Sequence, residues 1–414
     1  GVADIIYLAS DGPRLYFNQS GNGWSDPTIL SQCPTIDNLS SVVTADLLSN
    51  GTACLVWSSP LAAHAHRPLR YIQLMEQKPH LLTGMKNNLG AETRVQYAPS
   101  TKFYLADAQA RKPWITRIPF PVHVVERVET YDWISRNRFV TRYAYHDGYF
   151  DGEEREFRGF GMVEQFDTEE FAALSETGEL PMGENIDQVS HVPPVHTKTW
   201  FHTGAFLEGE KISLHFAHEY FGAPRKTEPN YEVKFREFLK TLLPDTIMPP
   251  GLTIGEEREA CRALKGSILR QEVYAKDGSL KEAYPYTVSE RSYAIEPVQA
   301  AGTNRRGVFF VHPRETINYH HERNPTDPRV GHELILKVDR FGNVERAVAI
   351  GYPRRNPPAD LPEQGHTHMT LTVSRVANRS VEADWYRVGV SVEARTFEVV
   401  KPLHVPPGGD TRLT

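Results

Sequence analysis

Residues 142–165 read RYAYHDGYFDGEEREFRGFGMVEQ, and this stretch decides the fold class. Aromatic and charged residues alternate along it with the period of β-strands. The pair Asp151-Gly152 lies between two alternating runs and predicts a hairpin turn, because glycine and Asx residues tolerate the positive φ of tight turns. Gly148 is a second expected turn, and two phenylalanines lie beside Gly159 and Gly161. The stretch therefore predicts strand, turn and strand in a tyrosine-rich sheet rather than an active-site loop.

The same alternation predicts which side chains of the second strand are buried. Glu154 and Glu156 fall on one face, and Phe157 and Gly159 on the other. We expect Phe157 to pack against neighbouring strands and Gly159 to leave room for an aromatic ring lying across the backbone. Consecutive glutamates after a turn favour an exposed outer face, so a structural and not a catalytic role is predicted for them.

The composition is that of a folded globular protein. The 414 residues are enough for two or three domains, with 40% hydrophobic, 24% charged and 10% aromatic residues. The 30 prolines and 29 glycines favour many short strands over long helices. A net charge of −6 gives no basic footprint for nucleic acid. No run of 18 apolar residues predicts a membrane-spanning helix.

The termini and cysteines carry little further information. The chain opens with GVADIIYLASDG, without an initiator Met, a basic leader or a cleavage site, so we expect a fragment with no signal peptide of its own. Cys33, Cys54 and Cys261 fit neither a disulfide framework nor a zinc-binding CxxC pair. We expect them to be small buried hydrophobic residues.

Residues 1–60 contain one pattern twice, about fifty positions apart. Residues 3–7 and 53–57 are similar short strands, and repeats of this length built from strands favour propeller blades. The loop from Asp46 to Gly51 resembles a calcium loop of such blades. Leu48 and Cys54 stand where oxygen ligands are expected, so we predict a turn without a metal.

Turn residues and alternation divide the rest of the chain into strands and three helices. A helix at 168–176 is expected from Thr168 as its cap, one at 229–243 from an apolar stripe behind Pro229, and one at 256–264 from its early glutamates. Strands are expected at 69–74, 93–97, 103–105, 122–130, 138–145, 268–275, 286–293, 308–312, 334–338, 344–350, 370–376 and 389–397.

Two histidine-rich stretches come nearest to a metal motif. His215, His218 and Glu219 read HxxHE rather than the HExxH of zinc proteases, and they do not open a clear helix. The run His320-His321-Glu322 is no stronger as a metal-binding motif. His64 and His66 lack a third ligand nearby.

A glycosidase would need two carboxylates that flank a cleft. The candidates by proximity are Glu153, Glu154, Glu156, Glu164 and Asp167. No GxSxG, P-loop or Rossmann pattern is present. We therefore predict no catalytic, metal-binding or cofactor-binding residues, and no enzyme activity.

Several long stretches resemble one known family. They include residues 86–107, KNNLGAETRVQYAPSTKFYLAD, the run 119–171, residues 249–275, PPGLTIGEEREACRALKGSILRQEVYA, and residues 318–344, NYHHERNPTDPRVGHELILKVDRFGNV. This chain resembles the middle region of the B component of bacterial toxin complexes (Tc insecticidal toxins), which is related to Salmonella virulence-plasmid B proteins. The residues 338–352 also resemble the YDxxGNL…Y core of an RHS repeat, whose turn chemistry needs no ligand.

The resemblance implies a mainly β fold, with the end of a β-propeller followed by an RHS-type spiral β-sheet shell and a few short helices. It implies a secreted structural role in virulence: enclosing a cytotoxic passenger of the C component and docking on the pore-forming A component for translocation into host cells. Nucleic acid and direct membrane insertion are not implied. The expected parts are propeller blades at 1–67, shell regions at 68–225 and 267–400, a helical insertion at 226–266 and a linker at 401–414.

Two other classes of protein remain open from the residues alone. A secreted carbohydrate-binding or adhesion module would also be β-rich, aromatic and acidic, and glycan arrays would identify it. A glycoside hydrolase is the other alternative, and activity on generic substrates would identify that.

Overall fold

The computed structural model describes residues 3–76, 78–168, 180–184, 193–207, 210–211, 214 and 216–400. The chain divides into two compact units. The first comprises Gly1–Thr83, Tyr97–Lys102 and Phe120–Val125, and the second comprises Gly84–Gln96, Phe103–Pro119 and Glu126–Thr414. Strands dominate both units, which confirms the expected mainly β fold.

The first unit contains two small antiparallel sheets. One consists of β1 (Ile5–Ala9), β2 (Gly12–Tyr16) and β3 (Thr28–Ile29), and the other of β4 (Ser41–Ala45), β5 (Cys54–Ser58) and β6 (Leu69–Gln73). Both are three-stranded, as a repeated pattern predicts, while a propeller stays a prediction. The expected boundary at residue 67 would separate β5 from β6, which are hydrogen-bonded to each other. The first unit instead runs to Thr83.

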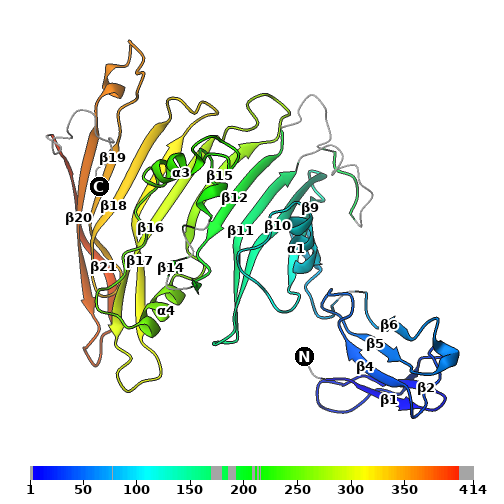
Figure 1. The fold of residues 1–414 in the computed structure, drawn as a ribbon. Helices are drawn as coiled ribbons and strands as arrows, with labels where there is room; N and C mark the ends of the chain where they lie inside the picture. The colour runs from blue at the N-terminus through cyan, green and yellow to red at the C-terminus, as the bar shows by residue number, and fades with distance from the viewer. Residues whose placement is uncertain are drawn as a thin grey trace. The chain divides into compact units, whose positions relative to one another are not determined.

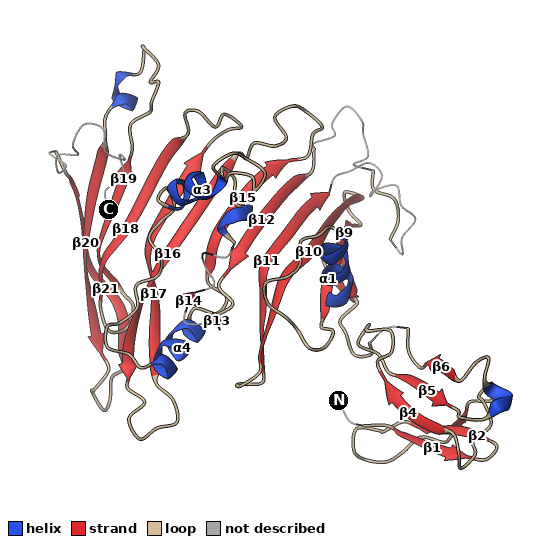
Figure 2. Cartoon of the chain, in the orientation of Figure 1, coloured by secondary structure: helices blue, strands red, loops and turns tan. Residues whose placement is uncertain are grey.

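The second unit is built on one thirteen-stranded sheet (Figures 1 and 2). From β9 to β21 its strands pair antiparallel in chain order, with only the short ladder of β13 (Phe206–Leu207) and β14 (Glu210–Lys211) outside it. Apart from β6 and the β13–β14 ladder, the strands of the two expected shell regions, 68–225 and 267–400, therefore share a single sheet. Its strands are β7 (Gly84–Lys86), β8 (Ala91–Pro99), β9 (His123–Asp132), β10 (Asn137–Asp151), β11 (Glu156–Thr168), β12 (Val195–Phe201), β15 (Ile268–Ala275), β16 (Thr287–Gln299), β17 (Val308–His320), β18 (Arg329–Val338), β19 (Val344–Gly351), β20 (His368–Arg379) and β21 (Arg387–Glu398).

The hairpin of β10 and β11 confirms the turn at Asp151-Gly152. Asp151 and Glu156 are register partners, and the turn lies between them. Gly148 was expected in a turn and this was wrong, because it lies inside β10 at a shift of register. A Cβ atom there would lie 2.1 Å from Ile118 Cδ1 and 2.9 Å from Trp114 Cζ3, so packing and not turning requires glycine.

The expectation for Gly159 was also wrong, while Phe157 lies opposite Phe150 of the neighbouring strand. Phe157 is only half-buried and meets Phe160 edge to face at 5.6 Å. Gly159 has a φ of +93° and no atom within 4 Å of its Cβ position, so it provides backbone freedom rather than room for a ring. The ring lies over Gly161 instead, where a Cβ atom would be 2.4 Å from Phe216 Cζ. Truncation of Phe157 should therefore cost less than that of a fully buried phenylalanine.

Gly161→Ala is expected to destabilise the protein by about 1–3 kcal/mol, as overpacked cores do. The added methyl group must displace Phe216, which is fully buried. Gly331→Ala in β18 is the matched control, since no atom lies within 4 Å of its Cβ position. Denaturant titrations of the two variants should give a clear loss for the first and none for the second. Equal stabilities would contradict the packing at Gly161.

The helix at 256–264 was predicted with nearly correct bounds. It is α4 (Ile254–Ala263), which begins two residues earlier because Thr253 and Glu256 form a capping box. The helix expected at 229–243 is shorter: α3 (Tyr231–Leu239) begins after Asn230, whose φ of +58° is left-handed. The helix expected at 168–176 lies outside the described residues, except for Thr168 at the end of β11, and so does the linker at 401–414.

A strand predicted at 103–105 is wrong, because these residues lie in α1 (Ser100–Gln109). The run Phe-Tyr-Leu is too short to show a period, and the alanines that follow favour a helix. Short 3₁₀ turns complete the described elements, at η1 (Ala62–His64), η3 (Ala217–Glu219) and η4 (Pro362–Gly365). The other predicted strands fall on observed ones, although the pair at 308–312 and 334–338 is considerably longer in the structure.

Helices α3 and α4 cover the same face of the sheet (Figure 1). Phe235, Phe238 and Leu239 of the α3 segment pack on a cluster around Trp200, while Ala260 and Leu264 pack on β16 and β17. A row of register partners crosses seven strands on this face, and every member is buried: Met162, Trp200, Arg270, Glu290, Ile317, His332 and Ile350. We call this the covered face and the opposite one the open face.

Candidate functional site

A buried ionic network interrupts the apolar row on the covered face. Arg270 Nε donates to Glu272 at 2.6 Å, and Arg270 Nη1 donates to Glu290 at 2.6 Å. The three residues are 1–6% exposed. Alternation along β15 places Arg270 and Glu272 on one face, and the register places Glu290 beside Arg270. Buried charges of this kind require partners, because leaving water is costly.

The network also ties down the segment that carries α3. Glu272 accepts the backbone N–H of Phe221 at 2.8 Å, and Glu290 accepts that of Leu243 at 3.0 Å. Arg270 lies over the ring of Tyr220, with its guanidinium carbon 4.7 Å from the ring centroid. Both ends of residues 221–243 are therefore held by carboxylates of the sheet.

A second charged cluster joins the β10–β11 hairpin to α4. Glu156 is bound by Arg262 at 3.1 Å and by Lys265 at 3.0 Å, while Glu154 pairs with Arg306. The side chains of Glu154 and Glu156 are only 11% and 28% exposed, so the expected outer face for them is wrong. Apart from Arg158, 3.4 Å from Glu156, their cations come from residues more than 100 positions further along the chain, which alternation cannot reveal.

The carboxylates considered for a glycosidase do not form one site. Glu153 pairs with Arg258 of α4. Glu164 lies on another part of β11, 3.6 Å from His196 and 3.7 Å from Lys198. Asp167 accepts hydrogen bonds from Thr141 and Gln165. The glutamates of the hairpin therefore lie among the arginines of α4 and its flanking segments, whereas Glu164 and Asp167 lie apart from them with partners of their own.

The pH dependence of stability should report on Glu164. Burial alone would raise its pKa, but His196, 3.6 Å away, and the charge of Lys198 hold the pKa at about 2. Because this pKa is below the ordinary 4.5, the stabilisation is present above pH 4.5 and is lost as the pH falls toward 2. Glu164→Gln is expected to cost up to about 3 kcal/mol at pH 7, and the difference should shrink steadily below pH 4.5.

Asp167→Asn is the control for this measurement, since it changes an exposed carboxylate of the same strand. We expect a change below about 0.5 kcal/mol. Urea titrations at pH 7 and pH 3 compare the variants. A Glu164→Gln penalty that does not change with pH would contradict the assigned ion pairs.

The loop from Asp46 to Gly51, predicted as a turn without a metal, is held by hydrogen bonds to its own backbone. Asp46 accepts hydrogen bonds from the N–H groups of Asn50 and Gly51, at 3.0 and 2.9 Å. His64 Nδ1 contacts Ser59 Oγ at 2.8 Å, so it is turned toward a hydroxyl. Asp46 and His64 therefore both have partners within their own segments.

The other histidine motifs also have local partners. His218 and Glu219 lie in η3, and Glu219 accepts the indole N–H of Trp200, while His215 lies outside the described residues. The ring of His321 meets that of Phe221 edge to face, and burial lowers its pKa. Glu322 pairs with Arg329. Within the described ranges, no three His, Cys, Asp or Glu residues are grouped to hold a metal ion.

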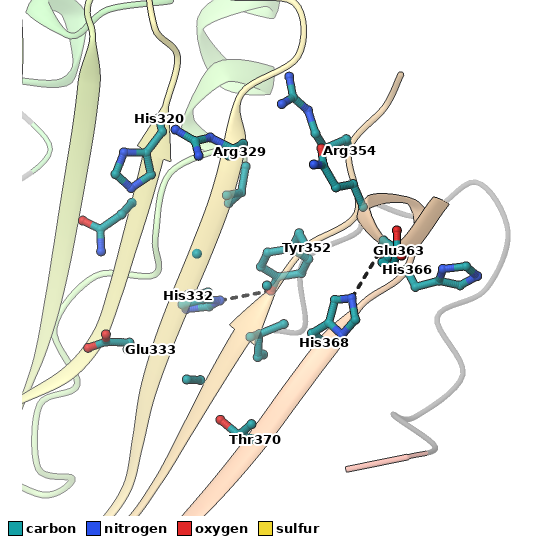
Figure 3. Close-up of a pocket in the computed structure, with 17 residues that line it drawn as sticks. His320, Arg329, His332, Glu333, Tyr352, Arg354, Glu363, His366, His368 and Thr370 are labelled. Atoms are coloured by element: carbon teal, nitrogen blue, oxygen red, sulfur yellow. Dashed lines mark hydrogen bonds between the residues drawn. The ribbon is translucent and has the colours of Figure 1, made fainter. Parts of the chain in front are cut away.

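His320 lies instead on a groove that the sequence did not reveal. The groove has a volume of about 560 Å³ and is formed by β17 to β20 and the loop after β19 (Figure 3). Its labelled side chains include Arg329, Glu333, His368 and Thr370. On the covered side, His332 contacts the hydroxyl of Tyr352 at 3.0 Å and lies 3.3 Å from Glu315. The only sequence sign of this groove was the pair of strand glycines, Gly331 and Gly351.

The remaining sequence expectations concern cysteines and membranes. Cys33, Cys54 and Cys261 are all free, and the last two are buried as expected. In the part of the chain that the structure describes, no helix has the length and apolarity to span a bilayer.

These features define a class of protein: a broad antiparallel sheet on which buried ion pairs anchor the segments that cover one face. Two family models match the chain. The model of the insecticide toxin TcdB middle/N-terminal region matches residues 18–204, and that of the TcdB middle/C-terminal region matches residues 259–382. The chain is therefore a Tc-toxin B-component-like protein.

Solved structures agree with the family models. The chain aligns with the crystal structure of TcdB2–TccC3–Cdc42 at 27% identity over 95% of its length, with a TM-score of 0.75. The crystal structure of TcdB2–TccC3 matches at 26% identity over 95% with the same TM-score. The Photorhabdus luminescens Tc holotoxin pore matches at 27% identity over 96%, with a TM-score of 0.72. The chain spans only 18–19% of the length of these proteins. No curated protein matches it in sequence.

Proposed function

We propose that this chain is part of the wall of a toxin-complex B component that encloses a cytotoxic passenger. The passenger is supplied by a C component, and the assembled container docks on a pore-forming A component for passage into a host cell. The protein would act outside the producing cell and would carry no catalytic activity of its own.

The observation that carries this proposal is the thirteen-stranded sheet itself. A sheet of this width, with α3 and α4 anchored on one face only, is suited to a wall rather than a compact enzyme core. Support comes from the alignment with TcdB2 in structures that also contain TccC3, and from the alignment with a holotoxin pore.

The test is protection of the passenger from protease in the full B and C complex. The passenger in the wild-type complex should survive a protease dose that degrades the free passenger. Arg270→Met in the wall should shorten this protection, because it loosens the covered face. Arg375→Met is the matched control, since that side chain is 74% exposed. A passenger digested equally fast inside and outside the wild-type complex would contradict enclosure.

Docking is measured separately, by sizing the complex with a pore-forming A component. We expect the wild-type B and C complex to co-elute with the A component. A complex that protects its passenger and yet never co-elutes would support enclosure and contradict docking.

A further inference from the structure

Two paired glycines line the floor of the groove. Gly331 of β18 and Gly351 of β19 are register partners, between Asn318 of β17 and His368 of β20. This row is one residue away from the buried row through His332. Because successive strand residues point to opposite faces, the glycines lie on the open face. The floor is therefore a patch of bare backbone two strands wide.

This patch is an exception in the fold. The described strands contain five glycines whose φ lies outside the left-handed region: Gly84, Gly148, Gly161, Gly331 and Gly351. Side chains cover the first three, namely Arg94 over Gly84, Ile118 and Trp114 over Gly148, and Phe216 over Gly161. Gly331 has no atom within 4 Å of its Cβ position, and Gly351 has only the adjacent His368 at 3.9 Å. The backbone that forms the groove floor is thus open to a ligand.

We infer that the groove binds an aromatic side chain of an extended peptide segment, with an acidic residue beside the ring. Glycine within a strand marks a close approach of another group, and an aromatic ring packed across glycine is a recurrent solution in sheets. The same protein contains such a packing of a ring across a glycine, where Phe216 lies over Gly161. A volume of about 560 Å³ has room for a ring and the adjoining peptide units.

The walls of the groove place hydrogen-bond donors at one end and a carboxylate at the other. The lining residues include two arginines and two glutamates, and each arginine also pairs with a carboxylate outside the lining, Arg329 with Glu322 and Arg354 with Asp327. His320 and Arg329 are register partners at one end of the floor, while Glu333 and Thr370 lie at the other. A carboxylate next to the ring would therefore meet donors at the first end.

A sugar fits this groove less well than a peptide. Sugar rings commonly stack on an aromatic side chain, and apart from imidazoles the lining offers only Tyr352. The hydroxyl of Tyr352 contacts His332 of the buried row, so this side chain belongs to the covered face. The identification of the peptide as part of the enclosed passenger rests on the proposed function. The binding chemistry of the groove is independent of that function.

The test uses the full chain and short peptides, without any passenger. The probe is acetyl-Glu-Ser-Tyr-Ser-Glu-amide, compared by calorimetry or NMR titration with the same peptide carrying Ala for Tyr. A second comparison carries Lys for both Glu. We expect each replacement to weaken binding by roughly tenfold, which corresponds to about 1.4 kcal/mol.

Gly331→Val is the decisive variant, because its side chain fills the floor without a clash. Its melting temperature should not fall, since valine suits a strand and the space is free. Peptide affinity should drop by roughly tenfold or more. Thr396→Val, an exposed position in β21 outside the groove, is the matched control and should bind like the wild type.

Three results would overturn the inference. These are unchanged affinity in Gly331→Val, equal binding of the tyrosine and alanine peptides, and displacement of the peptide by methyl glucoside at low concentration, which would make the groove a glycan site. Since no passenger is present, failure of the peptide to bind contradicts the groove inference alone. Loss of passenger protection in the separate complex experiment contradicts enclosure alone.

Discussion

Arg270→Met is expected to destabilise the second unit by about 3–5 kcal/mol, the usual cost of breaking a buried ion pair. Arg270 is only 3% exposed and is the cation between Glu272 and Glu290. Methionine preserves much of the packing volume, but it leaves two buried carboxylates without their cation. Desolvation of those carboxylates, rather than a lost contact, supplies most of the penalty.

The loss should be local before it is global. Glu272 and Glu290 hold the backbone at Phe221 and Leu243, which are the two ends of the segment that carries α3. When these carboxylates draw in water after the loss of Arg270, that segment loses its anchors. Amide hydrogen exchange in Tyr231–Leu239 should therefore accelerate more than exchange in β19 and β20.

A compensated variant separates charge from packing. Arg270→Met combined with Glu272→Gln and Glu290→Gln removes all three charges but keeps oxygen acceptors for the two backbone N–H groups. Most of the lost stability should return, as it does when buried ion networks become neutral. Arg375→Met, whose side chain is 74% exposed and 3.8 Å from Glu393, should cost below about 0.5 kcal/mol. A triple variant as unstable as Arg270→Met would contradict the charge argument.

The sequence was sufficient for elements that local chemistry determines. The Asp151-Gly152 turn follows from the φ that tight turns require. The segment at 338–344 forms the β18–β19 turn, in which Asp339 accepts the N–H groups of Phe341 and Asn343. The long stretches that resemble a known family carried the class of protein, and both family models confirm it.

Features that depend on distant residues could not be predicted. Alternation showed that Glu154 and Glu156 share a face, but not that Arg262 and Arg306 would lie against it. In the same way, Gly161 could be seen beside Phe160, whereas the ring that requires it belongs to Phe216, 55 positions later. Period-two patterns assign faces, and only the packing of another segment decides which face is buried.

The groove on the open face was also beyond prediction, for a different reason. Gly331 and Gly351 lie 20 positions apart in the sequence, and each alone suggests a bulge or a weak strand. Their meaning depends on register, because a shift of one residue between β18 and β19 would separate them. Register in turn depends on the β18–β19 hairpin turn.

Trp200→Ala is expected to cost about 3–5 kcal/mol, the range for fully buried aromatic truncations. Trp200 has no exposed surface and lies in the middle of the cluster beneath α3. It meets the ring of Tyr220 edge to face at 5.0 Å, and its indole N–H donates to Glu219 at 3.1 Å. The variant therefore leaves a cavity and removes a hydrogen bond at the same time.

The matched control is Trp385→Ala, in the loop between β20 and β21, where the side chain is 54% exposed. We expect a loss below about 0.5 kcal/mol there. Trp200→Phe should lie between the two, since it keeps an aromatic ring on the sheet but cannot donate to Glu219. Denaturant titration gives the order, and limited proteolysis of residues 216–243 shows whether the α3 segment is released. If Trp200→Ala were as mild as Trp385→Ala, the α3 segment would not be packed on the sheet in solution.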